Sequence, residues 1–371
     1  MHVVHRLDFG GLENGLVNLI NRMEPSRYRH AVVCLTGYTD FAKRIQRPAV
    51  PLIALNKQPG KDPACYWRLG RTIRSLKPDV VHTRNLGTLD MQFVAALYAV
   101  RGRVHGEHGW DVYDLHGKHP RYLRLRRVAR RFVKRYVAMS RDLALWLQGS
   151  VGVPAGRITQ IYSGVDTDRF RPRHASDRPP WPPGFACADA IVIGTVGRQE
   201  QVKNPLGLVQ AFGRLVDAVP DLAARLRLVL VGGGPMVEQV GRKVAELGLG
   251  AQTWLPGPRN DVAEILRQLD VFVLPSLNEG ISNTILEAMA CAIPVVASRV
   301  GGTPEVVREG QTGLLYSSQD ETELTLRLRT YVEDAALRSE HGRQARAVVE
   351  QHHSLDSMVR NYLDVYDAVL K

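Results

Sequence analysis

The sequence is poor in cysteine and in long apolar runs. Its four cysteines are scattered among 371 residues, with no CxxC pair and no zinc-ligand spacing. This argues against a disulfide framework or a structural zinc site and favours a reducing compartment. No stretch approaches the roughly 18 uninterrupted apolar residues that span a membrane, and the first residues lack the pattern of a secretory signal. We therefore expect a cytoplasmic protein.

Length and apolar content favour two domains, since 371 residues of which 44% are hydrophobic can fill two cores. Short apolar runs alternate with helical patterns throughout the chain, which is typical of parallel sheets covered by helices. Strands are predicted at 2–7, 30–35, 79–83 and 136–140, and again at 190–197, 226–234, 271–275 and 294–298. The predicted fold class is therefore α/β, with two doubly wound domains.

A proline-rich stretch, residues 171–187, separates the two series of strands. Closely spaced prolines are excluded from helix interiors and central strands, so this stretch is the predicted interdomain linker. It divides the chain into an N-terminal domain, 1–170, and a C-terminal domain, 188–353. Residues 354–371 have apolar positions at helical spacing, which predicts a final helix that could pack back on the N-terminal domain.

The excess positive charge lies in one half of the chain. Residues 1–170 contain 28 Lys and Arg against 13 Asp and Glu, whereas the remainder contains 21 against 24. This asymmetry predicts that the N-terminal half meets an anionic partner. Phospholipid, lipid pyrophosphate and nucleic acid all fit the sign of the charge.

Residues 118–135 hold nine of these cations and no acid. Their periodicity predicts a basic amphipathic helix. Its apolar stripe would pack on the domain, and it consists of Tyr122, Leu125, Val128, Ala129, Phe132 and Tyr136. Its cations could face an anionic membrane or simply be solvated, and they include Arg124, Arg127, Arg131, Lys134 and Arg135. Nucleic acid is disfavoured because the stretch has no recognised nucleic-acid motif or interleaved aromatics.

Two loops that follow predicted strands carry features suited to phosphate. Gly10 and Gly11 come after the first strand and open a helix, so their backbone N–H groups could meet an anion, although a tight turn explains them equally well. Arg198 and Lys203 follow the first strand of the second domain, at the sheet edge where parallel sheets bind ligands. These two cations could stabilise a departing diphosphate without a metal. The alternative is a pair of solvated surface cations.

A third loop follows the predicted strand 271–275 and contains the run Gly280, Ile281, Ser282 and Asn283. It offers free backbone N–H groups at the start of a helix, which suit phosphate. Glu279 precedes this run and Glu287 lies two helical turns later. Two such carboxylates could accept hydrogen bonds from sugar hydroxyls, although ordinary helix chemistry would also place them there.

Six motifs in this order and spacing resemble the family 4 retaining glycosyltransferases of GT-B fold: GGLE, GRQEQVKNP, LVGGGP, LPGPRNDV, EGISNTILEAMACAIPVVAS and VGGTPEVV. The resemblance implies two Rossmann-like domains that face each other across a donor-binding cleft. Within the family, HVVHRLDFGGLENGLVNLI and HGWDVYDLHG resemble bacterial exopolysaccharide sugar transferases of the exosortase/PEP-CTERM-associated type. Leu12 stands where many relatives have alanine.

The resemblance also implies roles for matching residues of the second domain. Arg198 and Lys203 would bind the donor diphosphate, with the backbone of 280–283 adding hydrogen bonds. Glu279 would contact the sugar hydroxyls and Glu287 the ribose. The resemblance further implies that Gly10 and Gly11 approach the diphosphate. It places His108 at the reacting centre and Arg259 near the nucleotide base.

The expected reaction is transfer of a hexose, with retention, from a UDP- or GDP-sugar to a glycan or polyprenyl-diphosphate-linked acceptor. The expected location is the inner face of the cytoplasmic membrane, as a peripheral protein. No cofactor or metal is expected, because the DxD run at 166–168 is interpreted as structural and the GGGP run does not complete a dinucleotide fingerprint. The alternatives are a UDP-sugar epimerase on the same fold and a non-catalytic membrane-associated assembly protein, with a nicotinamide oxidoreductase last.

Overall fold

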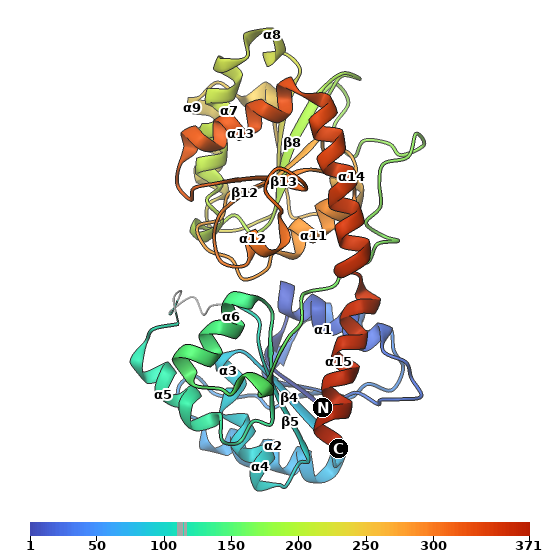
Figure 1. Ribbon diagram of the computed structural model, residues 1–371, viewed down its shortest axis with the longest axis vertical. Helices are drawn as coiled ribbons and strands as arrows, with labels where there is room; N and C mark the ends of the chain where they lie inside the picture. The colour runs from blue at the N-terminus through green and yellow to red at the C-terminus, as the bar shows by residue number, and fades with distance from the viewer. Residues whose placement is uncertain (110–113, 115–116) are drawn as a thin grey trace. The chain divides into compact units, whose positions relative to one another are not determined.

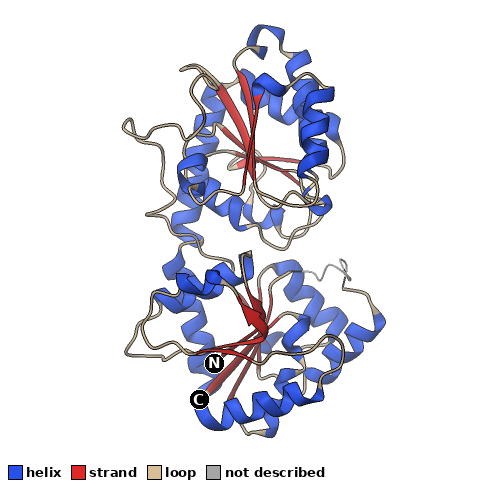
Figure 2. Ribbon diagram, turned by 180° about the vertical axis from the view of Figure 1, so that it is seen from behind, coloured by secondary structure: helices blue, strands red, loops and turns tan. Residues whose placement is uncertain are grey.

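The computed structural model describes residues 1–109, 114 and 117–371, which divide into two compact units. Unit 1 comprises Met1–Gly164 together with Leu355–Lys371, and unit 2 comprises Val165–Ser354. Each unit contains one sheet with helices around it (Figures 1 and 2).

Unit 1 is built on a parallel sheet of seven strands in the order β3-β2-β1-β4-β5-β6-β7. Its strands are β1 (His2–Leu7), β2 (Val32–Tyr38), β3 (Leu52–Ala54), β4 (Val80–Arg84), β5 (Gly102–Glu107), β6 (Arg135–Ala138) and β7 (Ile158–Gln160). Its α-helices are α1 (Gly11–Arg22), α2 (Pro63–Leu76), α3 (Leu86–Leu89), α4 (Met91–Leu97), α5 (Pro120–Ala129), α6 (Arg141–Trp146) and α15 (Leu355–Leu370). Shorter helical turns are Asp40–Arg44, Leu147–Val151 and Ala155–Arg157. Apolar strands buried between helices account for the continuous hydrophobic runs in the sequence.

The last helix, α15, packs on the sheet of unit 1. Met358 and Tyr362 belong to the same buried cluster as Val80, Val104 and Val137 of strands β4, β5 and β6. The final segment of the chain therefore completes the core of the unit in which the chain begins.

Unit 2 is built on a parallel sheet of six strands in the order β10-β9-β8-β11-β12-β13. Its strands are β8 (Ile191–Val196), β9 (Leu226–Val231), β10 (Thr253–Gly257), β11 (Val271–Leu274), β12 (Val295–Ser298) and β13 (Gly313–Tyr316). Its helices are α7 (Pro205–Ala218), α8 (Pro220–Ala223), α9 (Val237–Glu246), α10 (Val262–Leu266), α11 (Asn283–Ala290), α12 (Thr303–Val306), α13 (Glu321–Glu333) and α14 (Ala335–His352), with short turns at Gln201–Lys203 and Gly250–Gln252. The two predicted doubly wound domains are confirmed.

The chain passes between the units at Gly164 and Val165, before the proline-rich stretch that the sequence suggested as the linker. Residues 171–187 belong to unit 2, where side chains fix them. Arg171 pairs with Asp177 at 2.8 Å, and Arg267 of unit 2 approaches the same carboxylate at 3.7 Å. Prolines exclude regular structure from this stretch, but these charges attach it to the body of unit 2.

The predicted basic helix is shorter than expected and ends at Ala129. The N–H of Lys134 donates to the carbonyl of Arg103, and the chain then pairs with β5 as strand β6. Tyr136, placed in the helical stripe, is instead a fully buried residue of β6. Burial of this strand in the sheet overrides helical periodicity.

Among the described residues, no helix combines the length and apolar character needed to cross a membrane. Cys34, Cys65 and Cys291 are buried free thiols, and Cys187 is an exposed one.

Candidate functional site

The loop after β8 carries Arg198 and is held by the glycine run after β9. The N–H groups of Gly197 and Gln199 donate to carbonyls of Val231 and Gly233 at 3.0 and 2.8 Å. A Cβ on Gly232, whose φ is +135°, would lie 1.9 Å from the carbonyl oxygen of Gly197. The LVGGGP run therefore shapes the Arg198 loop, a role that sequence reasoning missed although glycines after a strand signal a close backbone approach.

Lys203 ends a short helical turn immediately before α7. Asn204 then adopts the left-handed conformation, with φ 49° and ψ 49°, and its side chain accepts a hydrogen bond from the N–H of Gly207. Pro205 occupies the first turn of α7, where its missing N–H costs nothing. The KNP sequence thus turns the chain sharply from the Lys203 loop into α7.

The structure brings Lys203 and Glu279 together as an ion pair between Nζ and Oε1. The Ser276 hydroxyl donates to the same carboxylate oxygen at 2.8 Å. The N–H of Leu277 donates to the carbonyl of Val202 at 2.7 Å, which joins the two loops through their backbones. Both charges are partly exposed, so a ligand could still reach them.

Arg198 is the most exposed of the predicted donor-binding side chains in this loop. Its side chain is 73% exposed, and its only ion pair within the described chain is a 3.7 Å approach to Glu200. Exposed pairs at such a distance contribute little free energy. The guanidinium is therefore available to a ligand at small cost.

The Glu279 loop packs against the VGGTP segment. The N–H of Gly302 donates to the carbonyl of Gly280 at 2.9 Å. A Cβ on Gly301, whose φ is +48°, would lie 1.7 Å from the carbonyl oxygen of Glu279. Within the described residues, the N–H groups of Gly280, Ile281 and Ser282 have no recorded acceptor, and α11 begins at Asn283. The predicted backbone donors are thus present at a helix start.

Glu287 lies in the second turn of α11 and is partly buried. Burial raises the pKa of its carboxyl to about 7, with a smaller opposing effect from the Arg169 charge. Near neutral pH the carboxyl therefore exists in both protonation states. A sugar hydroxyl that donates to the ionised form would lower this pKa again.

Arg259 lies after β10 and is held locally. It forms a bidentate pair with Asp261, at 2.8 and 2.6 Å, and its guanidinium lies 5.7 Å from the centre of the Trp254 ring. Within the described residues no recorded contact links it to Lys203, Glu279 or Glu287.

In unit 1, Gly11 and His108 line one narrow cavity together with Arg84, Ser163 and Tyr362. Gly10 is the N-cap of α1 in an extended conformation, with φ −170°. A Cβ on Gly10 would lie 2.3 Å from Oε2 of Glu13 in the first turn of α1. The Glu13 carboxylate therefore occupies the space that a side chain at position 10 would need.

His108 is held through its backbone. The backbone N–H of His108 donates to Oδ1 of Asn85 at 2.7 Å, while the backbone N–H of Asn85, which has φ 55°, donates to the carbonyl of Gly106. Within the described chain, both ring nitrogens are buried and lack a hydrogen-bond partner. Burial, followed by the charge of Arg84, lowers the pKa of His108 to about 3. The ring is neutral and can still donate one hydrogen bond and accept another.

The buried pair Glu107 and Arg126 was not found from the sequence. Arg126 Nε lies 2.8 Å from Glu107 Oε1, and the two side chains are 4% and 1% exposed. Burial alone would raise the pKa of Glu107, but the neighbouring His105 ring, whose Nε2 lies 3.5 Å from Glu107 Oε1, and the Arg126 charge lower it to about 2. Arg126 thus joins α5 to β5, and the nine-cation run hid this role because nothing distinguished one arginine from its neighbours.

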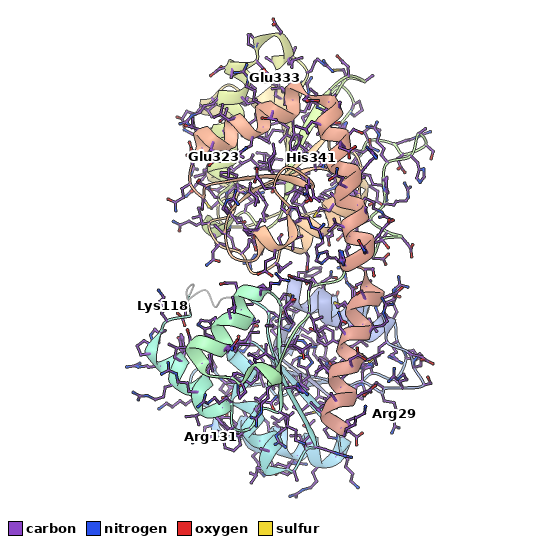
Figure 3. The ribbon with its side chains drawn as sticks, viewed as in Figure 1. Arg29, Lys118, Arg131, Glu323, Glu333 and His341 are labelled. Atoms are coloured by element: carbon purple, nitrogen blue, oxygen red, sulfur yellow. The ribbon has the colours of Figure 1, made fainter. Side chains whose placement is uncertain are left out.

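The predicted membrane-side cations differ in their surroundings. Arg127 donates to the carbonyl of Ser150, and Arg135 to that of Gly156. Arg124, Arg131 and Lys134 are exposed, and Figure 3 shows Arg131 at the outside of unit 1.

Within the described residues, no group of three or more His, Cys, Asp or Glu side chains is placed to hold a metal ion. Oδ1 of Asp166 accepts the N–H groups of Asp168 and Arg169, so the DxD run includes a local turn. Residues 110–113 and 115–116 of the HGWDVYDLHG motif lie outside the described residues.

Two family models match the chain in succession. The model described as Glycosyltransferase Family 4 matches residues 9–169, and the one described as Glycosyl transferases group 1 matches 185–348. The chain belongs to the glycosyltransferases. The loops of Arg198, Lys203 and Glu279 lie within the second match, and Gly10, Gly11 and His108 of this glycosyltransferase lie within the first.

Curated relatives carry related names. A D-inositol 3-phosphate glycosyltransferase of Stackebrandtia nassauensis is 39% identical over 192 residues, which cover 49% of this chain and 42% of the relative. An N-acetyl-alpha-D-glucosaminyl L-malate synthase of Bacillus anthracis is 33% identical over 188 residues, covering 51% and 48%. The matched part of this glycosyltransferase spans about half the length of these relatives.

Solved structures share the fold of this glycosyltransferase over its whole length. A glycosyltransferase of Rickettsia africae aligns with a TM-score of 0.82 at 18% identity, covering 100% of this chain and 98% of the other. HepE of Anabaena in complex with UDP-glucose aligns with a TM-score of 0.81 at 21% identity, covering 99% and 98%. At this level of identity the likeness establishes the GT-B fold.

Proposed function

We propose that the chain transfers a hexose from a UDP- or GDP-sugar to a hydroxyl of a glycan, with retention at the anomeric carbon. The observation that carries the proposal is the Lys203–Glu279 ion pair, which joins the loops after β8 and β11, together with the exposed Arg198 in the loop after β8. Carboxylates accept hydrogen bonds from sugar hydroxyls, and paired cations stabilise a diphosphate leaving group. The names of the curated relatives, which describe transfer of glycosyl groups, support the same reaction class.

In the proposed mechanism, Arg198 and Lys203 neutralise the charge that builds on the departing diphosphate. The N–H groups of residues 280–282 add hydrogen bonds to the phosphates or the sugar. Lys203 and Ser276 hold one oxygen of Glu279, which leaves the other to accept a sugar hydroxyl. We expect attack from the face that the diphosphate leaves, with no carboxylate nucleophile and no required metal or cofactor. Transfer should then persist in excess EDTA.

The remaining assignments belong to the same proposal. Glu287 binds the ribose, Arg259 lies near the base, and Gly10, Gly11 and His108 contribute from unit 1. The acceptor is a glycan or polyprenyl-diphosphate-linked glycan of bacterial exopolysaccharide synthesis, reached at the inner face of the cytoplasmic membrane. The motif resemblance and the positive charge of unit 1 support this acceptor and location.

The direct experiment measures nucleotide release by the purified full chain from a panel of UDP- and GDP-sugars, with and without bacterial lipid extract. Release from one donor that increases with lipid would support the proposal and identify the donor. Conversion of the sugar without an acceptor would instead favour an epimerase. Absence of release or conversion across the panel would contradict the proposal for these donors.

A further inference from the structure

Exposed apolar side chains lie on α2, where Trp67 is beside a cation, and at the end of α4. Large apolar side chains are mostly buried in folded proteins. Trp67 and Leu97 are instead 58% and 81% exposed. Tyr66 is exposed as well. We call the following set the α2–α4 face: Tyr66, Trp67, Arg71, Arg74, Leu97 and Tyr98.

Contacts between these side chains connect the two helices. The guanidinium carbon of Arg71 lies 4.9 Å from the centre of the Trp67 ring, and that of Arg74 lies 5.5 Å from the centre of the Tyr98 ring. The phenol of Tyr98 packs over Gly70 of α2, where a Cβ would lie 2.5 Å from its oxygen. The α2–α4 face is therefore an ordered surface in which cations and aromatic rings already touch.

The charged members of the α2–α4 face are cations, although the Tyr66 hydroxyl donates to the Asp90 carboxylate at 2.7 Å. Helix α2 contains Arg68, Arg71 and Arg74 and no acid. Asp62, its N-cap, pairs with Arg68 at 2.5 Å. Within the described residues, Arg71 and Arg74 have no ion pair and are exposed. Unit 1 as a whole contains 29 Lys and Arg against 14 Asp and Glu. Two unpaired cations beside exposed rings thus favour an anionic partner with an apolar interior.

We propose that the α2–α4 face binds the surface of an anionic lipid bilayer. Tryptophan and tyrosine favour the boundary between lipid headgroups and acyl chains, because each ring has an apolar body and a polar end. Each cation near such a surface adds about 1 kcal/mol to the attraction. A symmetric contact with a second copy is disfavoured, because related arginines would face each other across the twofold axis. This proposal deepens the membrane part of the proposed function and moves it from α5 to α2.

The α5 surface provides the internal comparison. Of its predicted membrane-side cations, Arg127 and Arg135 already bind backbone carbonyls of unit 1. Arg124 and Arg131 are exposed, but the large apolar side chain that is exposed on the described helix α5 is a valine, Val128. Helix α5 therefore offers positive charge but little apolar area to insert into a bilayer. The α2–α4 face offers positive charge and exposed apolar area together.

The test is co-sedimentation of the full chain with vesicles of equal parts phosphatidylglycerol and phosphatidylcholine, or of phosphatidylcholine alone. We expect binding to the anionic vesicles only, with loss of binding at high salt. The double variant Arg71→Gln/Arg74→Gln should bind about thirtyfold more weakly, since two cations at about 1 kcal/mol each correspond to that factor. Trp67→Ala/Leu97→Ser should also weaken binding, through loss of inserted apolar area.

Two control variants separate this surface from general charge effects. Leu326→Ser/Arg329→Gln removes an exposed leucine and an arginine from α13 of unit 2 and should leave binding unchanged. Arg124→Gln/Arg131→Gln tests the α5 surface and should weaken vesicle binding less than Arg71→Gln/Arg74→Gln does. A larger loss in the α5 variant, or no vesicle binding by the unaltered chain, would overturn the proposal.

Nucleotide release by the same variants, measured without vesicles, keeps this proposal distinct from the transferase itself. The α2–α4 variants should release nucleotide at the normal rate, because their altered residues lie outside the donor loops. Vesicle binding without any transferase activity would contradict the proposed function alone. Normal transferase activity without vesicle binding would contradict the α2–α4 proposal alone.

Discussion

The two units differ in how they hold their charged side chains. In unit 2, Arg198, Lys203 and Glu279 lie at strand ends and remain partly or largely exposed. In unit 1, Arg84 and the Glu107–Arg126 pair are buried, although this unit has the larger excess of positive charge. The difference shows that density of charge in the sequence is a poor guide to binding. Exposure decides which charges a ligand can reach and which ones hold the fold.

The largest expected effect comes from breaking the buried pair of unit 1. Arg126→Met leaves Glu107 buried without its cation, so we expect the free energy of unfolding to fall by about 3–5 kcal/mol. Chemical denaturation measures this value. Arg343→Met removes an exposed partner of Glu340 on α14 and should cost less than about 1 kcal/mol. If the two substitutions lower the free energy of unfolding equally, burial does not decide how much an ion pair contributes to stability.

Next in size is the loss of an exposed charge in unit 2. Arg198→Ala should lower kcat by about a hundredfold to a thousandfold, the usual effect of removing a group that stabilises developing charge, while the fold remains intact. Arg242→Ala is a matched control, because Arg242 is 69% exposed and approaches Glu238 at 3.8 Å. If both variants keep near-normal turnover, Arg198 has no catalytic role.

A backbone substitution should affect the Glu279 loop more moderately. Gly301→Ala combines a left-handed φ with a collision against the carbonyl of Glu279, so we expect a loss of about 2–3 kcal/mol in unfolding free energy and weaker donor binding. Gly310 also has a left-handed φ, of +70°, but no atom lies within 4 Å of its added Cβ. Gly310→Ala should therefore cost only about 1 kcal/mol and should leave donor affinity unchanged in a calorimetric titration.

The smallest expected effect depends on pH. Because the folded pKa of Glu287 is raised to about 7, the folded protein binds more protons than the unfolded chain between about pH 4.5 and 7. Glu287→Gln does not titrate, so its stability relative to the unaltered chain should increase as pH rises through this window. We expect a gain of about 1–2 kcal/mol above pH 7, after allowance for partial exposure.

Thermal unfolding of the Glu287→Gln variant across this pH range measures the gain. The matching substitution of an exposed carboxylate, Glu264→Gln on α10, should leave stability nearly unchanged at every pH. A gain for Glu287→Gln that is constant with pH would contradict burial as the cause.

Much of the fold could be predicted because local patterns and global architecture agree. Eight strands were expected from apolar runs, and each lies on a strand of the structure. Five others, β3, β5, β7, β10 and β13, were not singled out, since several are short or contain glycine and polar residues. The strand β6 competed with a helical pattern, and pairing with β5 decided between them.

The position of a candidate site residue could be predicted where its motif is continuous in sequence and directly follows a strand. Lys203 and Glu279 lie 76 positions apart, yet each follows a strand, and parallel strands bring such loops to one sheet edge. The glycine run at 232–234 and the VGGTP segment could not be assigned this way, because their role is to leave space for backbone far away in sequence. Asn85 and Arg84 carried no signal, because neither belongs to a motif with a known spacing.

The sequence by itself determined the two α/β domains, the glycosyltransferase resemblance and the uneven charge, since these depend on periodicity and on motifs within short segments. Only the tertiary structure decided that Arg126 is a buried anchor, that the unit boundary precedes the prolines, and that α2 presents exposed rings beside cations that have no ion pair among the described residues. The physical reason is that burial and partners are set by residues distant in the chain. A charged side chain therefore shows its role only when the fold has placed its neighbours.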